Sequence, residues 1–500
     1  MIGLTHEQRQ DIGLRFILDL LDPSCPYGAR LLKDQSFYTS AAKDELEREL
    51  DNVEIMLSAL ENSPDRITSV RHALSTLKDI SGTIKNCSDG CVLTEVELFE
   101  LTAFLLRIKE LIPLAESLAG YDYMEGTRFR AVDEPLAVLD PRGDGRLSFY
   151  IEDSRTPKLF RIRHQKRELE RKHRLPRGGR DAAMAGRDGA VADNDGAVAD
   201  RDAAMAERLA ITSDEERELS SIYFAMTEAL RPMMPLIEHN AAAAGRLDAA
   251  ICKALLARRF GAARPAIGCE SLAFKDAVNP EVAESLSRDG RLFTPITIEL
   301  VRGVTILTGA NMGGKSVAIK TIMLNTALAL MGYFVFCSKG NIPMFDRIEL
   351  INRDLSSVSS GLSSFGGEIM RFNEAVGRIN DGGLSLIAMD EFARGTNSGE
   401  GSAIVRGVVE YLDNKNAVTI LATHYDGAAE HASRHYQARG LCLSDARPRT
   451  LAGSAVSFVA EHMDYSLAEV GKDAPPPRDA LEICRLLGMD EEILSTIGGQ

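Results

Sequence analysis

Residues 304–317 read VTILTGANMGGKSV, in which a short apolar run leads into a glycine-rich loop. Residues 309–316 fit the pattern GxxxxGK[ST] in full. The run before the loop predicts a strand, and VAIKTIMLNTALALMG after it predicts a helix. This strand–loop–helix order is the context in which the pattern binds nucleotide phosphates. The stretch therefore predicts an ATP-binding loop within an α/β fold.

The residues of this loop have different expected roles. Backbone N–H groups between the glycines, and the positive end of the following helix, favour phosphate oxygens. Lys315 supplies a positive charge to the β- and γ-phosphates, and the Ser316 hydroxyl is expected to bind Mg²⁺. The expected nucleotide-binding residues in this stretch are Gly309, Asn311, Met312, Gly313, Gly314, Lys315, Ser316 and Val317.

Two carboxylates follow another strongly apolar run. Residues 384–389, LSLIAM, have the composition of a buried strand and are followed by Asp390 and Glu391. A carboxylate at the carboxyl end of a strand can reach a magnesium ion held at the loop, and its neighbour can activate a water molecule. We therefore assign Asp390 to Mg²⁺ and Glu391 to the general base.

A third apolar run, residues 418–422, ends before Thr423 and His424. Ligands of α/β sheets bind beyond the carboxyl ends of the strands, so His424 is a candidate hydrogen-bond partner of the γ-phosphate. A histidine with a structural role at the end of a strand is the alternative, and the sequence leaves both open.

The composition of the whole chain is that of a globular protein. Its 500 residues are 45% hydrophobic and 26% charged, with a net charge of −15. This balance argues against a surface built throughout to coat nucleic acid. The longest mostly apolar run, residues 322–337, is too short and too interrupted for a membrane span, so no membrane partner is expected. The eight cysteines lack zinc-like spacing, which predicts free thiols in a reducing cytoplasm.

Periodicity divides the chain into four regions. Residues 1–120 carry helical periodicity and predict an α-helical core. Residues 121–265 carry further helical stretches and one short strand at residues 146–153 (RLSFYIED); in the family that the chain resembles, this is the lever and clamp region. Residues 266–430 alternate strand and helix signals, as in a mostly parallel sheet. Residues 431–500 predict the last part of this domain and two helical pieces, which the same resemblance makes a dimerisation segment.

A basic stretch and four repeats interrupt the lever region. Residues 155–180 are rich in Lys and Arg, and RDAAMAG, RDGAVAD, NDGAVAD and RDAAMAE follow in tandem at residues 180–207. A seven-residue period suggests a coiled coil. Each unit, however, offers one large apolar residue, and the middle units contain glycine, which disfavours helix. We expect residues 180–207 to form a flexible, weakly helical arm or a disordered insertion.

Three segments together resemble a known family. TGANMGGKS, MDEFARGTNSGEG and LATHY are similar to the ATPase domain of MutS-type proteins, which is of the ABC class. SSGLSSFGGEIMRF, residues 359–372, resembles the signature loop of that family, which crosses a dimer. The resemblance implies an ABC-type P-loop ATPase domain preceded by an all-α core and lever region. It further implies a homodimer with composite ATP sites, in which Ser363 contacts the γ-phosphate of the other subunit and Phe293 lies against adenine.

The resemblance extends upstream and has limits. YGARLLKDQSFYT and the helices after it are similar to the helical core of the family, and residues 208–260 to its lever helices. The loop has Ala310 where many relatives carry proline, and the signature reads GLSSF rather than GRSTF. No mismatch-reading domain and no nuclease-like domain is expected in this chain. The resemblance therefore carries over the ATP chemistry but not mismatch recognition.

Three hypotheses describe what ATP turnover drives. The first is a DNA-associated clamp of the mismatch-repair type, with the basic stretch on phosphates; its candidate contact residues are Arg161, Arg163, Lys166, Arg167, Arg171 and Lys172. For these residues a solvated arm at the base of a helical hairpin is the equal alternative. The second hypothesis is remodelling of a protein partner. The chain resembles short MutS-like ATPases that form the ATPase component of a reactivation factor for a cobalamin-dependent aminomutase (lysine 5,6-aminomutase). The length of the chain and PPRDAL fit that subgroup, and the acidic net charge fits it better than DNA binding. The third, a scaffold without turnover, disagrees with the complete set of ATPase residues.

Overall fold

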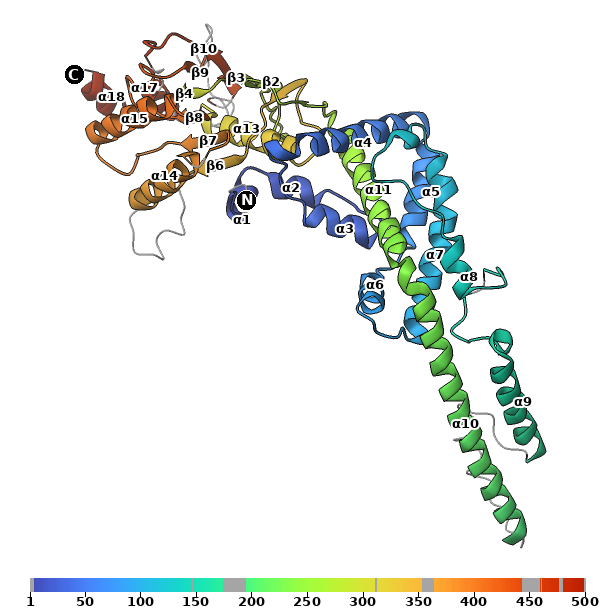
Figure 1. Ribbon diagram of the computed structural model, residues 1–500. Coiled ribbons are helices and arrows are strands. Elements are labelled where there is room, and N and C mark those ends of the chain that lie inside the picture. The colour runs from blue at the N-terminus through green and yellow to red at the C-terminus, as the bar shows by residue number, and fades with distance from the viewer. Residues whose placement is uncertain are drawn as a thin grey trace.

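The computed structural model describes residues 4–145, 147–173, 195–310, 313–352, 364–380, 382–442, 459, 461–475 and 480–498. An α/β part and a helical part lie side by side, and the helical part extends into a long rod (Figure 1). The mixed α/β architecture expected from the sequence is confirmed. Among the described residues, no helix combines the length and apolarity needed to cross a bilayer.

The helical part contains most of the first 260 residues. Its α-helices are α1 (His6–Asp11), α2 (Leu14–Asp19), α3 (Pro26–Lys33), α4 (Lys43–Asn62), α5 (Pro64–Ser75), α6 (Ser81–Ser88), α7 (Glu95–Glu116), α8 (Asp133–Leu139), α9 (Pro157–Lys172), α10 (Asp195–Leu230) and α11 (Met234–Phe260). Local sequence accounts for several boundaries; α7, for example, begins with a capping box between Thr94 and Glu97. The helical periodicity of residues 1–120 thus predicted the correct element type.

The short strand expected at residues 146–153 was wrong for the described part of that segment. Residues 147–152 contain no strand, and Asp153–Arg155 form a 3₁₀ turn. Side chains hold the segment instead: the Arg163 guanidinium lies 4.1 Å from the centre of the Tyr150 ring, and Tyr150 Oη donates to Asp153 at 2.6 Å. An alternating sequence becomes a strand only where another strand can pair with it.

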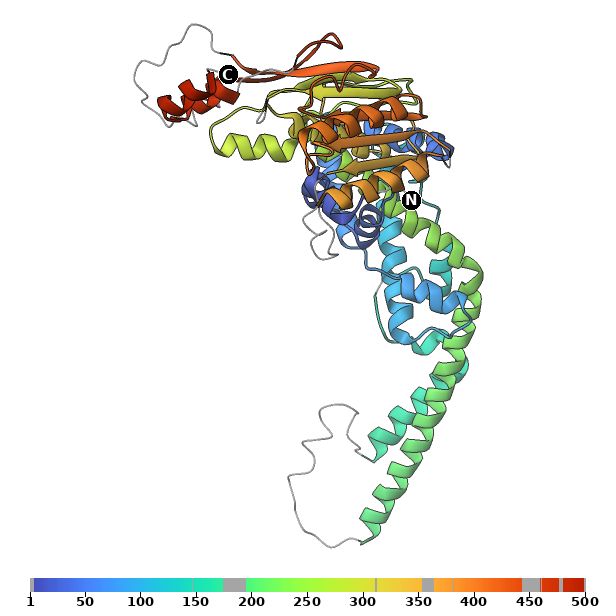
Figure 2. The same ribbon diagram turned by 90° about the vertical axis from the view of Figure 1, so that its left-hand side faces the viewer.

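The rod consists of α10 and α11, joined by a single 3₁₀ turn at Arg231–Met233. It descends from the α/β part, and α9 packs beside its far half (Figures 1 and 2). Residues 195–207, the second half of the seven-residue repeats, are the first turns of α10. Residues 180–194 lie outside the described residues, so their expected flexibility stays a prediction.

The α/β part has two sheets. The larger sheet has the order β10-β9-β4-β8-β7-β6, in which β9, β4, β8, β7 and β6 are parallel and β10 is antiparallel. Its strands are β4 (Gly303–Thr308), β6 (Arg347–Ile351), β7 (Ser385–Asp390), β8 (Ala417–Ala422), β9 (Arg434–Leu441) and β10 (Met463–Glu469). The smaller sheet contains β1 (Ala266–Ile267), β5 (Lys339–Ile342), β2 (Leu272–Ala277) and β3 (Ile296–Leu300). The mostly parallel sheet expected from the sequence is confirmed.

Two hydrophobic clusters cover the larger sheet. The α/β helices are α12 (Pro280–Arg288), α13 (Lys315–Leu330), α14 (Ser364–Asn380), α15 (Ser398–Asp413), α17 (Ala480–Leu486) and α18 (Glu491–Gly498). The cluster beneath α14 and α15 is separate. Buried residues of α13, by contrast, belong to one continuous cluster with those of α4, α7 and α11. The helix that follows the glycine-rich loop is therefore packed into the core of the helical part.

Candidate nucleotide site

The ends of three parallel strands meet at one edge of the larger sheet. Leu307 of β4 and Asp390 of β7 both pair in register with Ala422 of β8, the central strand of the three. Backbone bonds continue past the strands, from Thr423 N to Leu307 O at 3.0 Å and from Glu391 N to Ala422 O at 3.1 Å. The glycine-rich loop, the carboxylate pair and the histidine predicted from the sequence are thus brought to the same edge.

The described part of the loop has the backbone that its glycines predict. Gly314 caps the N-terminus of α13 with φ of +84°, a left-handed conformation that side chains disfavour. A Cβ added there would lie 3.1 Å from Cδ1 of Tyr465 on β10. α13 therefore begins with open N–H groups beside the loop, as a phosphate site requires. Asn311 and Met312 lie outside the described residues.

Lys315 is folded over the loop that precedes it. Its Nζ donates to the carbonyl oxygens of Gly309 and Ala310, both at 2.8 Å, and the residue is only 5% exposed. Burial lowers the pKa of Lys315, and the carboxylates of Glu391 and Asp390 oppose that shift. A buried ammonium held by carbonyl oxygens alone can exchange them for the stronger charge of phosphate oxygens.

Asp390 and Ser316 fit a metal ion. Burial raises the pKa of the Asp390 carboxyl group, and the side chain of Ser316 opposes that shift. Oδ1 of Asp390 is buried, and among the described residues no donor reaches it. A buried carboxylate oxygen without a partner is costly. A hard cation with oxygen ligands would satisfy it, as the sequence predicted.

Glu391 lies in a strained turn directly after β7. Its φ is +53° and that of Ala393 is +62°, values that are rare outside glycine. The surroundings hold this turn: Glu368 of α14 accepts from Ala393 N at 3.2 Å, and Tyr425 Oη donates to Ala393 O at 3.0 Å. Such strain persists only where neighbouring groups enforce it, and it is frequent at functional sites.

Arg394 is a neighbour of Glu391 to which the sequence prediction assigned no role. Its guanidinium forms an ion pair with the Glu391 carboxylate, three residues earlier in the same turn. The spacing inside the quoted MDEFARGT segment was the available signal. The pair orients the Glu391 carboxylate at the sheet edge, and a general base must be held in such a fixed position.

His424 follows the central strand and stacks on Tyr425, with ring centres 4.4 Å apart. Desolvation lowers its pKa and the Glu391 carboxylate opposes the shift. Lys315 and Arg394 also act electrostatically on His424, so the histidine belongs to the same charged group. A role on the γ-phosphate and a structural role are both compatible with this position.

The two residues assigned from the resemblance alone are placed differently. Phe293 lies in the segment between α12 and β3, partly buried against the main hydrophobic cluster. Nearby, Arg291 Nη2 donates to Tyr465 Oη at 3.3 Å, so this segment adjoins the tyrosine that covers Gly314. Ser363 lies outside the described residues, and its assigned contact across a dimer stays a prediction.

The N-terminal helix α1 also reaches the site, which sequence periodicity could not reveal. Asp11 accepts from Lys320 Nζ at 2.6 Å and from Asn352 Nδ2 at 3.0 Å. Lys320 is one turn beyond Ser316 on α13, and its charge opposes the rise that burial causes in the pKa of Asp390. Asp11 therefore links the face of α13 that carries Ser316 to the end of β6.

Several cations of the basic stretch are paired with carboxylates within the described part of the chain. The Arg163 side chain is only 7% exposed and binds Asp153 at 2.9 Å and Glu215 at 2.7 Å. Lys166 also binds Glu215, at 2.6 Å, and Arg167 binds Asp153. Arg161, Arg171 and Lys172 are exposed. The buried part of the stretch thus joins α9 to α10, and a DNA contact of the exposed residues stays a prediction.

We expect Arg163→Ala to loosen this hairpin. It leaves two carboxylates without their buried partner, and breaking one side of a buried pair costs about 3 kcal/mol or more. Amide hydrogen exchange in α9 should become faster by a corresponding amount. Arg171→Ala is the matched control, because that side chain is 82% exposed. Equal exchange in both variants would contradict the structural role of Arg163.

Comparison with known proteins agrees with this geometry. Residues 305–452 match the family model of MutS domain V, a span that includes the loop lysine and serine, both carboxylates and the histidine. The chain is 27% identical over 285 residues to "Endonuclease MutS2" of Caldanaerobacter subterraneus subsp. tengcongensis, covering 56% of this chain and 33% of that protein. It is 28% identical over 212 residues to "DNA mismatch repair protein MutS" of Natronomonas pharaonis, covering 42% and 24%.

A third relative, "DNA mismatch repair protein MutS" of Haloquadratum walsbyi, is 34% identical over 185 residues, which is 37% of this chain and 19% of that protein. The chain thus spans about a third or less of the length of these relatives. The matches support membership of the MutS family.

Proposed function

We propose that the chain, whose matches support a place in the MutS family, is an ATPase that binds ATP and Mg²⁺ at the carboxyl edge of β4, β8 and β7. The observation that carries the proposal is the convergence of Lys315, Ser316, Asp390 and Glu391 at that edge, with Oδ1 of Asp390 buried and unpaired among the described residues. An ABC-type P-loop domain is the fold that best accounts for this arrangement.

Each side chain has a defined part in the proposed reaction. The Lys315 ammonium would leave the loop carbonyls and bind the β- and γ-phosphates. Ser316 and Asp390 would hold Mg²⁺, which when bound neutralises charge on the phosphate oxygens. Glu391, oriented by Arg394, would take the proton of the attacking water. His424 would hydrogen-bond the γ-phosphate.

The site is proposed to be half of a composite site in a homodimer. Ser363 of a second copy would contact the γ-phosphate, and Phe293 would lie against adenine. ATP would thereby favour the closed dimer, and hydrolysis would release it. A ligand shifts such an equilibrium only through its different affinity for the two states, which contacts across the dimer supply. The C-terminal helices α17 and α18 are proposed to contribute to dimerisation.

The substrate that ATP turnover moves is a DNA structure or a protein. The family relationship favours a DNA-associated clamp of the mismatch-repair type. The internal ion pairs of Arg163, Lys166 and Arg167, together with the net charge of −15, favour the second candidate, a protein partner. For that partner we propose the cobalamin-dependent aminomutase, on the basis of sequence resemblance alone.

Stimulation of ATP hydrolysis separates these two candidates. Purified chain is assayed for phosphate release alone, with mismatched or branched duplex DNA, and with the aminomutase, at 50 mM and 200 mM salt as test conditions. A DNA clamp predicts stimulation by DNA that falls steeply with salt. Stimulation by the aminomutase and none by DNA would reject the clamp. Absence of ATP binding under all conditions would reject the proposed activity itself.

A further inference from the structure

A buried cation lies at the junction between the helical and α/β parts. Lys253 of α11 is 1% exposed, and its Nζ donates to Glu49 Oε1 of α4 at 2.7 Å and to Met331 O, just past α13, at 3.1 Å. The same ammonium lies 4.5 Å from the centre of the Tyr333 ring. Three segments that are far apart in the sequence therefore converge on a single charge.

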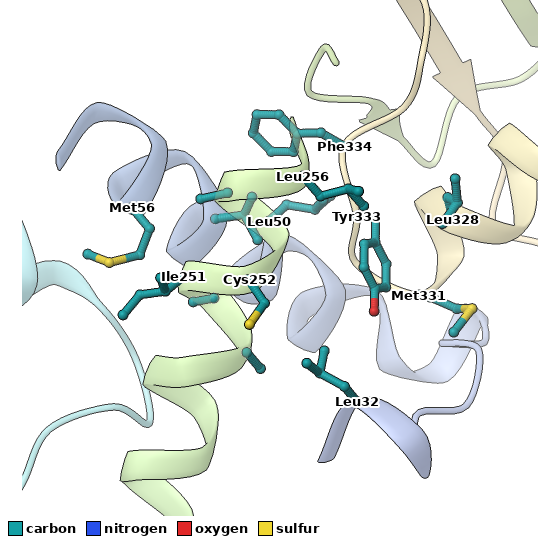
Figure 3. Packing of buried hydrophobic residues seen from close by; sticks show 14 of the residues in the cluster. Leu32, Leu50, Met56, Ile251, Cys252, Leu256, Leu328, Met331, Tyr333 and Phe334 are labelled. Carbon is teal, nitrogen blue, oxygen red and sulfur yellow. The ribbon is translucent and has the colours of Figure 1, made fainter. Parts of the chain in front are cut away.

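The surroundings of this charge are apolar. Figure 3 shows side chains of α4, α11, α13 and the turn after α13 packed together; those it labels include Leu50, Cys252, Leu256, Leu328, Met331 and Tyr333. Burial lowers the pKa of Lys253, while Glu49 opposes that shift. Apolar replacements of a buried ion pair are often as stable as the pair. What the ion pair adds to an apolar junction is orientation. Its hydrogen bonds fix how the helices are oriented relative to one another, and hydrophobic contacts do not.

The contact with Met331 places this charge at the far end of the helix that starts in the nucleotide site. α13 has 16 residues, so it spans about 24 Å from Lys315 to its last turn. A positive charge at the C-terminus of a helix is favourable. Tyr38 N and Gln35 Nε2 also bind carbonyls there, at 2.8 Å from Leu330 O and 2.5 Å from Met331 O. The end of α13 is thus held by the helical part at several points.

The turn after α13 leaves no room for adjustment. Gly332 has φ of +72°, and a Cβ added to it would lie 2.6 Å from Cγ of Glu49 and 3.4 Å from Nζ of Lys253. The backbone therefore touches both partners of the ion pair directly. A shift of α13 along its axis must move Glu49 and Lys253 with it or break their contacts.

We infer that Lys253 and Glu49 are positioning residues that couple α13, and through it the nucleotide site, to the rod formed by α11 and α10. Both residues are remote from the chemistry and act through Met331. This inference rests on the proposed ATPase function, since nucleotide is what would move the N-terminus of α13. Coupling free energies of this kind are typically 1–3 kcal/mol, a factor of about 5 to 150 in an equilibrium constant.

The test asks whether nucleotide binding changes amide hydrogen exchange in α11, in the parental chain and in a variant without the ion pair. Amide hydrogen exchange of the full chain is measured with and without the slowly hydrolysed ATP analogue AMP-PNP and Mg²⁺, together with the Kd for the analogue. In the parental chain we expect changed exchange at the site, in α13 and in α11. In Lys253→Met/Glu49→Leu, which keeps the junction apolar and packed, we expect the Kd to stay within about threefold, while the response of α11 falls by at least about fivefold.

A matched control lies just beyond the same helix. Arg264 follows the C-terminal end of α11, is 26% exposed and binds Asp51 and Glu54 of α4, both at 2.7 Å. Arg264→Gln should keep the full response of α11. An unchanged response of α11 in the double variant, with normal nucleotide binding, overturns the inference alone. A parental chain that binds no nucleotide overturns both the proposed function and this inference.

Discussion

Glu391→Gln is expected to bind ATP as tightly as the parental chain and to hydrolyse it at least about 100-fold more slowly. The amide keeps the size of the side chain and its place in the strained turn, but it cannot accept the proton of the attacking water. Hydrolysis is the step that would release the closed dimer, so ATP should also trap a dimer. Single-turnover phosphate release, equilibrium ATP binding and sedimentation in the presence of ATP measure the three effects.

A control variant separates loss of the base from a general effect of removing charge. Glu410→Gln changes an exposed glutamate of α15 and should leave the rate unchanged. The ion pair with Arg394 adds a second check, because Arg394→Ala should lower the rate while leaving ATP bound. If Glu391→Gln hydrolyses ATP at the parental rate, Glu391 is not the base.

Lys315→Ala should weaken ATP binding by about 100-fold or more. The variant removes a charge-assisted contact to the phosphates from a buried position, and such contacts are worth several kcal/mol when one partner is left unpaired. In this chain the lysine also binds two loop carbonyls, so its loss frees the loop that should hold the phosphates. Equilibrium binding of a fluorescent ATP analogue gives the Kd directly.

Two further variants distinguish charge from loop structure. Lys315→Met keeps most of the side-chain volume and should lose binding to a similar extent if charge is decisive. Lys339→Ala, on the exposed surface of β5 in the smaller sheet, should bind ATP normally. If Lys315→Ala binds ATP with the parental affinity, ATP does not bind at the glycine-rich loop, and that loop holds another ligand.

The residues at the sheet edge could be predicted because each follows a strand within a short, self-contained pattern. Lys315 and Ser316 follow β4, Asp390 ends β7 with Glu391 directly after it, and His424 follows β8. Alternation between apolar strands and amphipathic helices implies a parallel sheet, whose strand ends meet at one edge. Prediction of the elements and prediction of the edge residues thus came from the same local signal.

Contacts between distant segments could not be predicted in this way. Asp11 reaches Lys320, Arg163 reaches Glu215, and Lys253 reaches Met331 only after the helices pack. In the sequence, the cations near Arg163 resembled a surface for phosphates, whereas the folded chain pairs several of them with its own carboxylates. The sequence gives the number and order of the charged residues, but not which of them form ion pairs in the folded chain.

The amino-acid sequence alone was sufficient to predict the residues of the proposed ATPase chemistry. A phosphate-binding loop and its carboxylates are defined by backbone conformation and spacing over a few residues. Tertiary packing alone decided how that chemistry is connected to the rest of the chain. It buried Lys253 between α4, α11 and the end of α13, and it joined α9 to α10 of the rod with ion pairs. Those energies depend on desolvation and on distances across the core, which exist only once the chain has folded.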